Sequence, residues 1–229
     1  MDEREIGALM GQFYADQAAR EKADKLERYR RLNKFVRPGQ ILFVGSSLME
    51  QFPLYELIQG ESLPLMVYNR GIGGYTTREL QAALETCVFA LEPKYIFINI
   101  GTNDLNGPDY EETELIARYR QILNAIRERL PKAKLFLMAY YPTCPEVGNR
   151  NAYIKGLFQY RTNERIASAN RAVRALAEEL GAEFLDLNRW VTDEKGDMRA
   201  DITVEGMHMY ADGYKPVLDA LLPLLKTLK

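Results

Sequence analysis

The sequence predicts an α/β protein built on a parallel sheet with helices on both faces. Short apolar runs alternate along the chain with longer segments of helical periodicity. Parallel neighbours need crossover connections, which are right-handed and which the predicted helices supply. The five runs expected to form strands lie within residues 40–47, 64–74, 94–104, 134–143 and 182–190.

The predicted helices begin with a long one over residues 3–33. Its apolar side chains fall on one stripe: Ile6, Leu9, Met10, Phe13 and Tyr14. Such an apolar stripe must pack against another surface, either that of the domain itself or that of a partner subunit. The next helix, within residues 48–58, is broken or kinked near Pro53. The remaining helices are expected within residues 76–91, 111–130, 163–181 and 211–228.

The length and composition fit one globular domain over residues 1–229, with residues 1–36 as a helical extension packed on the domain or on a partner. Thirty basic and 32 acidic side chains give a formal charge of −2, which disfavours nucleic acid as a partner. The amino-terminal stretch lacks the apolar core of a secretion signal, and no apolar run is long enough to span a membrane. Because Cys87 and Cys144 form no evident disulfide framework, we expect a cytoplasmic protein. If a partner covers the stripe, we expect a homodimer.

Polar and glycine-rich turns follow the first three predicted strands. They read Gly45-Ser46-Ser47, Asn69-Arg70-Gly71-Ile72-Gly73-Gly74 and Gly101-Thr102-Asn103-Asp104. In an open parallel sheet, functional groups gather beyond the carboxyl ends of the strands. The only histidine of the chain, His208, lies in the segment VEGMH near the carboxyl terminus. Together these residues indicate one site.

The residue types at these positions match the needs of a serine hydrolase. A hydroxyl nucleophile requires a base, a group that orients the base, and donors that stabilise a developing oxyanion. Ser47 is the candidate nucleophile, His208 the general base, and Glu205, three residues earlier, the orienting carboxylate. The candidate oxyanion donors are the backbone N–H groups of Ser47 and Gly74 and the side-chain amide of Asn103.

Each of these residues also suits a structural role. Ser47 fits a helix N-cap, Asn103 a turn, and Gly74 a position that only requires positive φ. Asp201 is the reserve carboxylate if Glu205 points away from the imidazole. A single site explains these boundary residues more economically than separate structural roles do.

No metal or cofactor is expected. A zinc site needs a cluster of ligands, whereas this chain has one histidine and two cysteines distant from each other. The stretch GIGGYT lacks the spacing of a dinucleotide-binding loop. Met49 occupies the place of the second glycine in the nucleophile elbow of α/β-hydrolases, which disfavours that fold as well.

Four sequence blocks resemble those of the SGNH hydrolases, also called GDSL esterases and lipases. FVGSSLME resembles the first block of that family, NRGIGGYTT the second, GTND the third and EGMHMYADGY the last. The blocks are most similar to those of bacterial proteins described as platelet-activating-factor acetylhydrolase-like. The resemblance implies a flavodoxin-like three-layer α/β/α sandwich with strand order 2-1-3-4-5. It also implies Ser47 as nucleophile, Gly74 and Asn103 as oxyanion donors, and His208 as base.

Two positions depart from the usual blocks of this family. Ser46 stands where the family usually has Asp, and Glu205 stands where it usually has the triad Asp. Glutamate carries the same carboxylate on a longer stem, so it can orient the imidazole if the loop shifts. We therefore expect a serine esterase that cleaves a short acyl ester through Ser47, His208 and Glu205. The alternative is a catalytically weakened binding module for a carbohydrate or a lipid head group.

Overall fold

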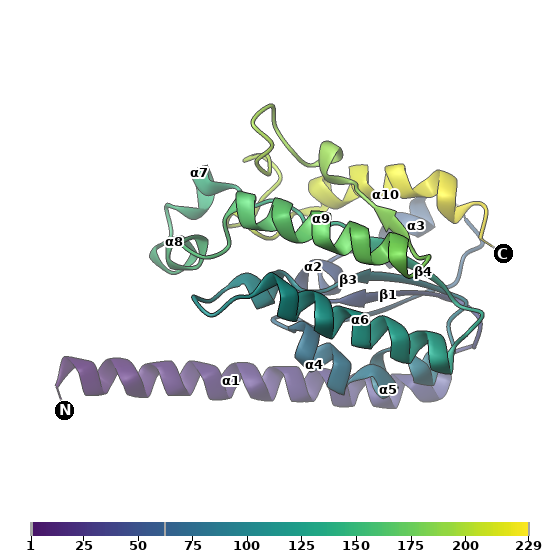
Figure 1. Cartoon of the computed structure of the whole chain (residues 1–229), viewed down its shortest axis with the longest axis horizontal. Coiled ribbons are helices and arrows are strands. Elements are labelled where there is room, and N and C mark those ends of the chain that lie inside the picture. Colours follow the sequence, from purple (N-terminus) through teal and green to yellow (C-terminus); the bar gives the residue numbers. More distant parts are fainter. Residues whose placement is uncertain (1, 62, 229) are drawn as a thin grey trace.

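The computed structural model describes residues 2–61 and 63–228, which form a five-stranded parallel sheet with helices on both faces (Figure 1). The strand order is β2-β1-β3-β4-β5. The fold class predicted from the sequence, and the order implied by the family resemblance, are therefore confirmed. The strands are β1 Ile41–Gly45, β2 Val67–Gly71, β3 Tyr95–Asn99, β4 Lys134–Met138 and β5 Glu183–Leu185.

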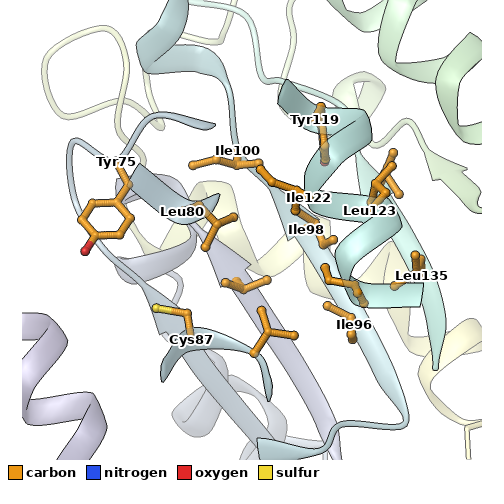
Figure 2. Packing of buried hydrophobic residues seen from close by; sticks show 14 of the residues in the cluster. Tyr75, Leu80, Cys87, Ile96, Ile98, Ile100, Tyr119, Ile122, Leu123 and Leu135 are labelled. Carbon is orange, nitrogen blue, oxygen red and sulfur yellow. The ribbon is translucent and has the colours of Figure 1, made fainter. Parts of the chain in front are cut away.

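Side chains of the central strands alternate between two hydrophobic clusters, one on each face of the sheet. Ile98 of β3 points to the first face, where Leu80 and Leu123 pack in the same cluster (Figure 2). Phe43 of β1 points to the second face and stacks on Phe97 with ring centroids 4.5 Å apart. Both halves of the core thus depend on the same strands, and we propose that the chain forms a single domain.

Different helices cover the two faces. The first cluster includes residues from α4 Thr77–Ala82, α5 Leu84–Cys87, α6 Glu112–Arg129 and α9 Asn163–Glu179, with the carboxyl-terminal part of α1 Glu3–Leu32. The second cluster includes residues from α2 Ser47–Glu50, α3 Leu54–Gly60 and α10 Ala211–Leu225. Short 3-10 helices occur at η1 Asn33–Phe35, η2 Phe89–Leu91, η3 Thr102–Leu105 and η4 Asn188–Trp190.

Two segments differ from the helices that the sequence predicts. The helix expected over residues 76–91 is divided into α4, α5 and η2, because Ala83 and Val88 take non-helical backbone angles. The stretch between β4 and α9 contains two short helices, α7 Pro145–Gly148 and α8 Ala152–Phe158. These helices have four and seven residues, which is too short for hydrophobic periodicity to reveal them.

The long helix α1 packs on the domain at one end and is uncovered at the other. Near its carboxyl end Tyr29 is buried, and its hydroxyl donates to the carbonyl of Gly71 at 2.7 Å. Residues 5–21 are exposed, and this half of α1 extends past the edge of the sheet (Figure 1). Within the described residues, no helix combines the length and the apolarity that crossing a bilayer requires.

The uncovered half of α1 carries the apolar stripe. Its five large side chains are between 45% and 60% exposed: Ile6, Leu9, Met10, Phe13 and Tyr14. A lone helix without packing is only marginally stable in water. Residues 5–19 hold two acidic and no basic side chains, whereas residues 20–34 hold seven basic and three acidic ones, so an antiparallel copy is complementary in charge. We propose that a second copy of this chain covers the stripe.

Charged substitutions in the stripe are expected to separate the two subunits. Light scattering should give the mass of a dimer for the wild type and of a monomer for the double variant Leu9→Glu, Phe13→Glu, because burying carboxylates at the interface is costly. Tyr153→Glu is the control, since Tyr153 is an exposed aromatic outside the stripe, and this variant should stay dimeric. A monomeric wild type at high protein concentration would contradict the proposal.

Candidate active site

The loops after β1, β2 and β3 meet at one edge of the sheet because these strands are parallel and in register. Gly45 at the end of β1 pairs with Gly71 of β2 and with Asn99 of β3. Each loop contributes one residue of the predicted site within four positions of its strand: Ser47, Gly74 and Asn103. The fold therefore gathers these residues at the carboxyl edge, where open parallel sheets bind their ligands.

Ser47 is the first residue of α2, and its interpretation as the N-cap is wrong. The N-cap is Ser46, whose carbonyl accepts from the backbone N–H groups of Met49 at 3.1 Å and Glu50 at 2.9 Å. Ser46 is buried, and its hydroxyl makes no hydrogen bond within residues 2–61 and 63–228. The hydroxyl of Ser47 instead lies 2.8 Å from Nε2 of His208.

His208 and Glu205 share a tight loop before α10. Nδ1 of His208 lies 2.5 Å from Oε1 of Glu205. The Thr203 hydroxyl fixes the loop from inside, because it donates to the carbonyl of His208 at 2.8 Å and accepts from the N–H of Gly206 at 2.9 Å. The carbonyl of Gly206 accepts from the N–H of Cys144 at 2.8 Å. This last bond ties the loop to the segment after β4.

Glu205 is the carboxylate that contacts the imidazole. Partial burial alone would raise the pKa of Glu205, but the hydrogen bond with His208 and the electrostatic attraction of its ring outweigh it and hold that pKa below its ordinary value. Asp201, the reserve candidate, is exposed and pairs with Arg199 at 3.2 Å. No hydrogen bond joins Asp201 to the imidazole in the described part of the chain.

The three groups expected to bind an oxyanion retain N–H donors. The backbone N–H groups of Ser47 and Gly74 make no hydrogen bond to any residue of the described ranges. The side-chain amide of Asn103 donates one N–H to the carbonyl of Tyr75 at 2.9 Å, and the other has no partner among the same residues. Its Oδ1 accepts from Nη2 of Arg161 at 2.7 Å. These groups offer N–H donors to an anion at the sheet edge.

Three glycines and two charged side chains shape the end of β2 and the loop after it. At Gly71 an added Cβ would lie 2.2 Å from the backbone nitrogen of Glu50, so glycine is required for α2 to pack this closely. Gly74 has a φ of +73°, in the left-handed region that favours glycine. The N–H of Gly73 donates to one oxygen of the Glu50 carboxylate at 2.5 Å, and the other oxygen pairs with Lys25 of α1 at 2.8 Å.

Sequence reasoning missed Lys25, Glu50 and Arg161, which hold the site loops in place. Lys25 and Arg161 lie outside the four motif blocks, and Glu50 ends the first block without any spacing that marks a role. Their partners are distant in sequence, so no local pattern could have found them. Asp104 of the third block has a structural role, because it accepts from the backbone N–H of Thr77 at 2.9 Å at the start of α4.

The two cysteines belong to the hydrophobic core, one on each face of the sheet. Cys87 and Cys144 are both buried and unpaired, and burial raises the pKa of the Cys87 thiol to about 12. Among the described residues, no group of three or more His, Cys, Asp or Glu side chains is placed to hold a metal ion.

Comparison with known proteins identifies the family. The model of the GDSL-like lipase/acylhydrolase family matches residues 45–215. The bovine platelet-activating factor acetylhydrolase IB subunit alpha1 is 27% identical over 188 residues, which are 81% of this chain and 75% of that protein. A solved structure from Streptococcus pneumonia, whose description names a platelet activating factor, is 28% identical with a TM-score of 0.85, covering 95% of this chain and 99% of that one.

A more distant structure shares the fold alone. The acetylxylan esterase Axe2 from Geobacillus stearothermophilus has a TM-score of 0.62 at 21% identity, and the match covers 83% of this chain and 95% of that one. The family match spans the loops of Ser47, Gly74 and Asn103 as well as the loop of Glu205 and His208. The chain therefore belongs to the GDSL-like lipase/acylhydrolase family and is a hydrolase that acts on ester bonds.

Proposed function

We propose that this hydrolase is a serine esterase that removes a short acyl group, such as acetyl, from an oxygen ester. One hydrogen-bonded chain carries the proposal: Oε1 of Glu205 lies 2.5 Å from Nδ1 of His208, and Nε2 of His208 lies 2.8 Å from Oγ of Ser47. A hydroxyl needs this arrangement to react at neutral pH, because a base must take its proton and a third group must orient the base.

Glu205 sets which ring nitrogen of His208 carries the proton. An ionised carboxylate only accepts hydrogen bonds, so Nδ1 of the neutral imidazole holds the hydrogen and Nε2 presents its lone pair to Ser47. The lowered pKa of Glu205 keeps the carboxylate ionised at neutral pH. The same carboxylate stabilises the imidazolium that forms when Nε2 takes the proton.

In the acylation step, Oγ of Ser47 attacks the carbonyl carbon of the ester as its proton passes to Nε2 of His208. The carbonyl oxygen becomes an oxyanion, which the backbone N–H groups of Ser47 and Gly74 and the amide of Asn103 stabilise. The tetrahedral intermediate then breaks the bond to the alcohol oxygen. The leaving alcohol takes the proton from Nε2, and the acyl group stays on Ser47.

Deacylation repeats these steps with water. His208 takes a proton from water as the water oxygen attacks the acyl carbonyl, and the same donors stabilise the second oxyanion. Collapse of this intermediate releases the carboxylic acid and returns the proton from Nε2 to Oγ of Ser47. Each oxyanion donor of this kind contributes about 10²- to 10³-fold to kcat in serine hydrolases.

The proposed preference of this chain for a short acyl group rests on the names of two similar proteins. The name of the bovine relative describes removal of an acetyl group, and the name of the Geobacillus enzyme describes an esterase for acetylated xylan. We propose that this chain shares with them the acetyl group that is removed, since the alcohols that carry it differ between the two names.

We also propose a cytoplasmic location, because Cys87 and Cys144 are free thiols rather than a disulfide.

The first test of the proposed function concerns Ser47. Ser47→Ala is expected to lower the kcat for p-nitrophenyl acetate by more than about 10³-fold, because it removes the nucleophile. Ser46→Ala is the matched control, since the hydroxyl of Ser46 has no partner in the described chain and its loss should leave kcat unchanged. An organophosphonate should add its mass to the wild type and not to Ser47→Ala. Equal hydrolysis rates in the wild type and Ser47→Ala would refute the esterase mechanism.

The same probe separates this mechanism from the alternative of a binding module for a carbohydrate or a lipid head group. A binding module would bind its ligand without being labelled at Ser47. The contact between Ser47 and His208 favours the esterase, because a module without chemistry has no need for a base on its serine.

The second test of the proposed function concerns Glu205. Glu205→Gln is expected to lower kcat by about 10²- to 10⁴-fold, because glutamine can also donate to Nδ1 and so permits the wrong tautomer of His208. Asp201→Asn supplies the control with the same loss of charge four positions away. Its carboxylate pairs with Arg199, so kcat should not change. If the two variants lose activity equally, Glu205 does not orient the base.

A further inference from the structure

Arg161 places a buried guanidinium between two loops of the site. It lies between α8 and α9 and is 6% exposed. Nη2 donates to Oδ1 of Asn103 at 2.7 Å, and Nε donates to Oδ1 of Asn106 at 2.8 Å. Nη1 lies 3.2 Å from Sδ of Met207, the neighbour of His208. One side chain thus contacts both the loop after β3 and the loop that carries the imidazole.

Within residues 2–61 and 63–228, no ion pair offsets the burial of Arg161. Among the described residues, its polar partners are the two neutral amides and the thioether sulfur. Burial lowers the pKa of Arg161 to about 10, although the negative charge of Glu205 acts against this. The guanidinium therefore stays protonated at neutral pH. Burying a cation without a direct ion pair is costly, which points to a role beyond stability.

The contacts of Asn103 determine which end of its amide faces each neighbour. A guanidinium only donates, so the acceptor Oδ1 of Asn103 must face Arg161. The carbonyl of Tyr75 only accepts, so Nδ2 must face Tyr75. If the amide were flipped, Nδ2 would face the donor Arg161 and Oδ1 would face the acceptor carbonyl of Tyr75, and both hydrogen bonds would be lost. Both neighbours therefore enforce the same orientation, which leaves one N–H of Asn103 available.

We propose that Arg161 is a positioning residue of the esterase, which holds the amide of Asn103 so that an N–H faces the oxyanion. The inference rests on the proposed function, because it requires Asn103 to act as an oxyanion donor. The charge on Arg161 also polarises the amide through Oδ1 and makes the remaining N–H a stronger donor. Arg161 acts through Asn103 and touches no reacting atom.

Arg165 offers a matched comparison within the same structure. Its Nη1 donates to the carbonyls of Leu105 and Gly107, both at 3.2 Å, so it braces the same loop. It makes no hydrogen bond to the Asn103 amide in the described part of the chain. If Arg161 only supported the loop, replacing Arg161 and replacing Arg165 should have similar effects on kcat. If Arg161 positions the amide of Asn103, only the replacement of Arg161 should lower kcat.

The test is a double-mutant cycle on the full-length protein with p-nitrophenyl acetate. Arg161→Leu and Arg161→Lys are each made with Asn103 intact and with Asn103→Ala. With Asn103 intact, kcat should fall about 10- to 100-fold at nearly constant KM, which is less than the effect of losing a whole oxyanion donor. In the Asn103→Ala background the same changes should alter kcat by less than about 2-fold, because the group they position is gone.

Folding is checked by circular dichroism and the thermal midpoint of each variant. Arg161→Lys keeps the buried charge and carries the test if Arg161→Leu does not fold. Arg165→Gln should lower the thermal midpoint and keep kcat within about 2-fold of the wild type. The role of Arg161 would be overturned if its variants lost the same factor of kcat in both Asn103 backgrounds, or if Arg165→Gln lost as much kcat as they do. Neither outcome would overturn the proposed esterase function. An unchanged rate in Ser47→Ala would overturn the proposed function and this inference together.

Discussion

The hydrogen bond between Nε2 of His208 and Oγ of Ser47 joins residues that are 161 positions apart, and the site depends on it. It requires β1 to deliver Ser47 to the sheet edge and the loop before α10 to return His208 to the same place. Tyr214 of α10 stacks on Phe52, which follows α2, with ring centroids 4.8 Å apart. Such pairs contribute about 0.5–1.5 kcal/mol beyond the area they bury. Core packing on this face thus sets the position of the imidazole relative to the hydroxyl.

A second layer of charged side chains holds the donors around that bond. The Glu50 carboxylate fixes the N–H of Gly73 and is itself paired with Lys25. The Arg161 guanidinium fixes the amide of Asn103. In both cases an ionised group holds a neutral one, and hydrogen bonds to ionised groups are stronger than neutral ones. Donors that are fixed before the reaction need not reorganise when charge develops, which is the main source of stabilisation by an oxyanion site.

The α/β class and the gathering of the site could be predicted because both follow from short-range patterns, whereas the strand order was implied by the family resemblance alone. Strand period, helix period and the glycine-rich turns after the strands locate Ser47, Gly74 and Asn103 at one edge. Other features depend on tertiary contacts and had no such signal. Whether Ser47 caps its helix was open, because cap and nucleophile use the same residue type at the same boundary. The contact of Arg161 with Asn103 crosses 58 positions, and the loop that makes it shows no periodicity.

The two departures from the usual motif have different physical consequences. Ser46 leaves a buried hydroxyl without a partner in the described chain, so the proposed nucleophile, Ser47, lacks a supporting carboxylate at that position. Glu205 reaches the imidazole despite its extra methylene, while Thr203 fixes the loop from inside. A longer side chain loses more rotamer freedom when it is held in one place. The hydrogen bonds that hold the loop therefore have to offset the larger entropy cost of fixing Glu205, and the rigidity of that loop sets how well the proposed base, His208, is aligned.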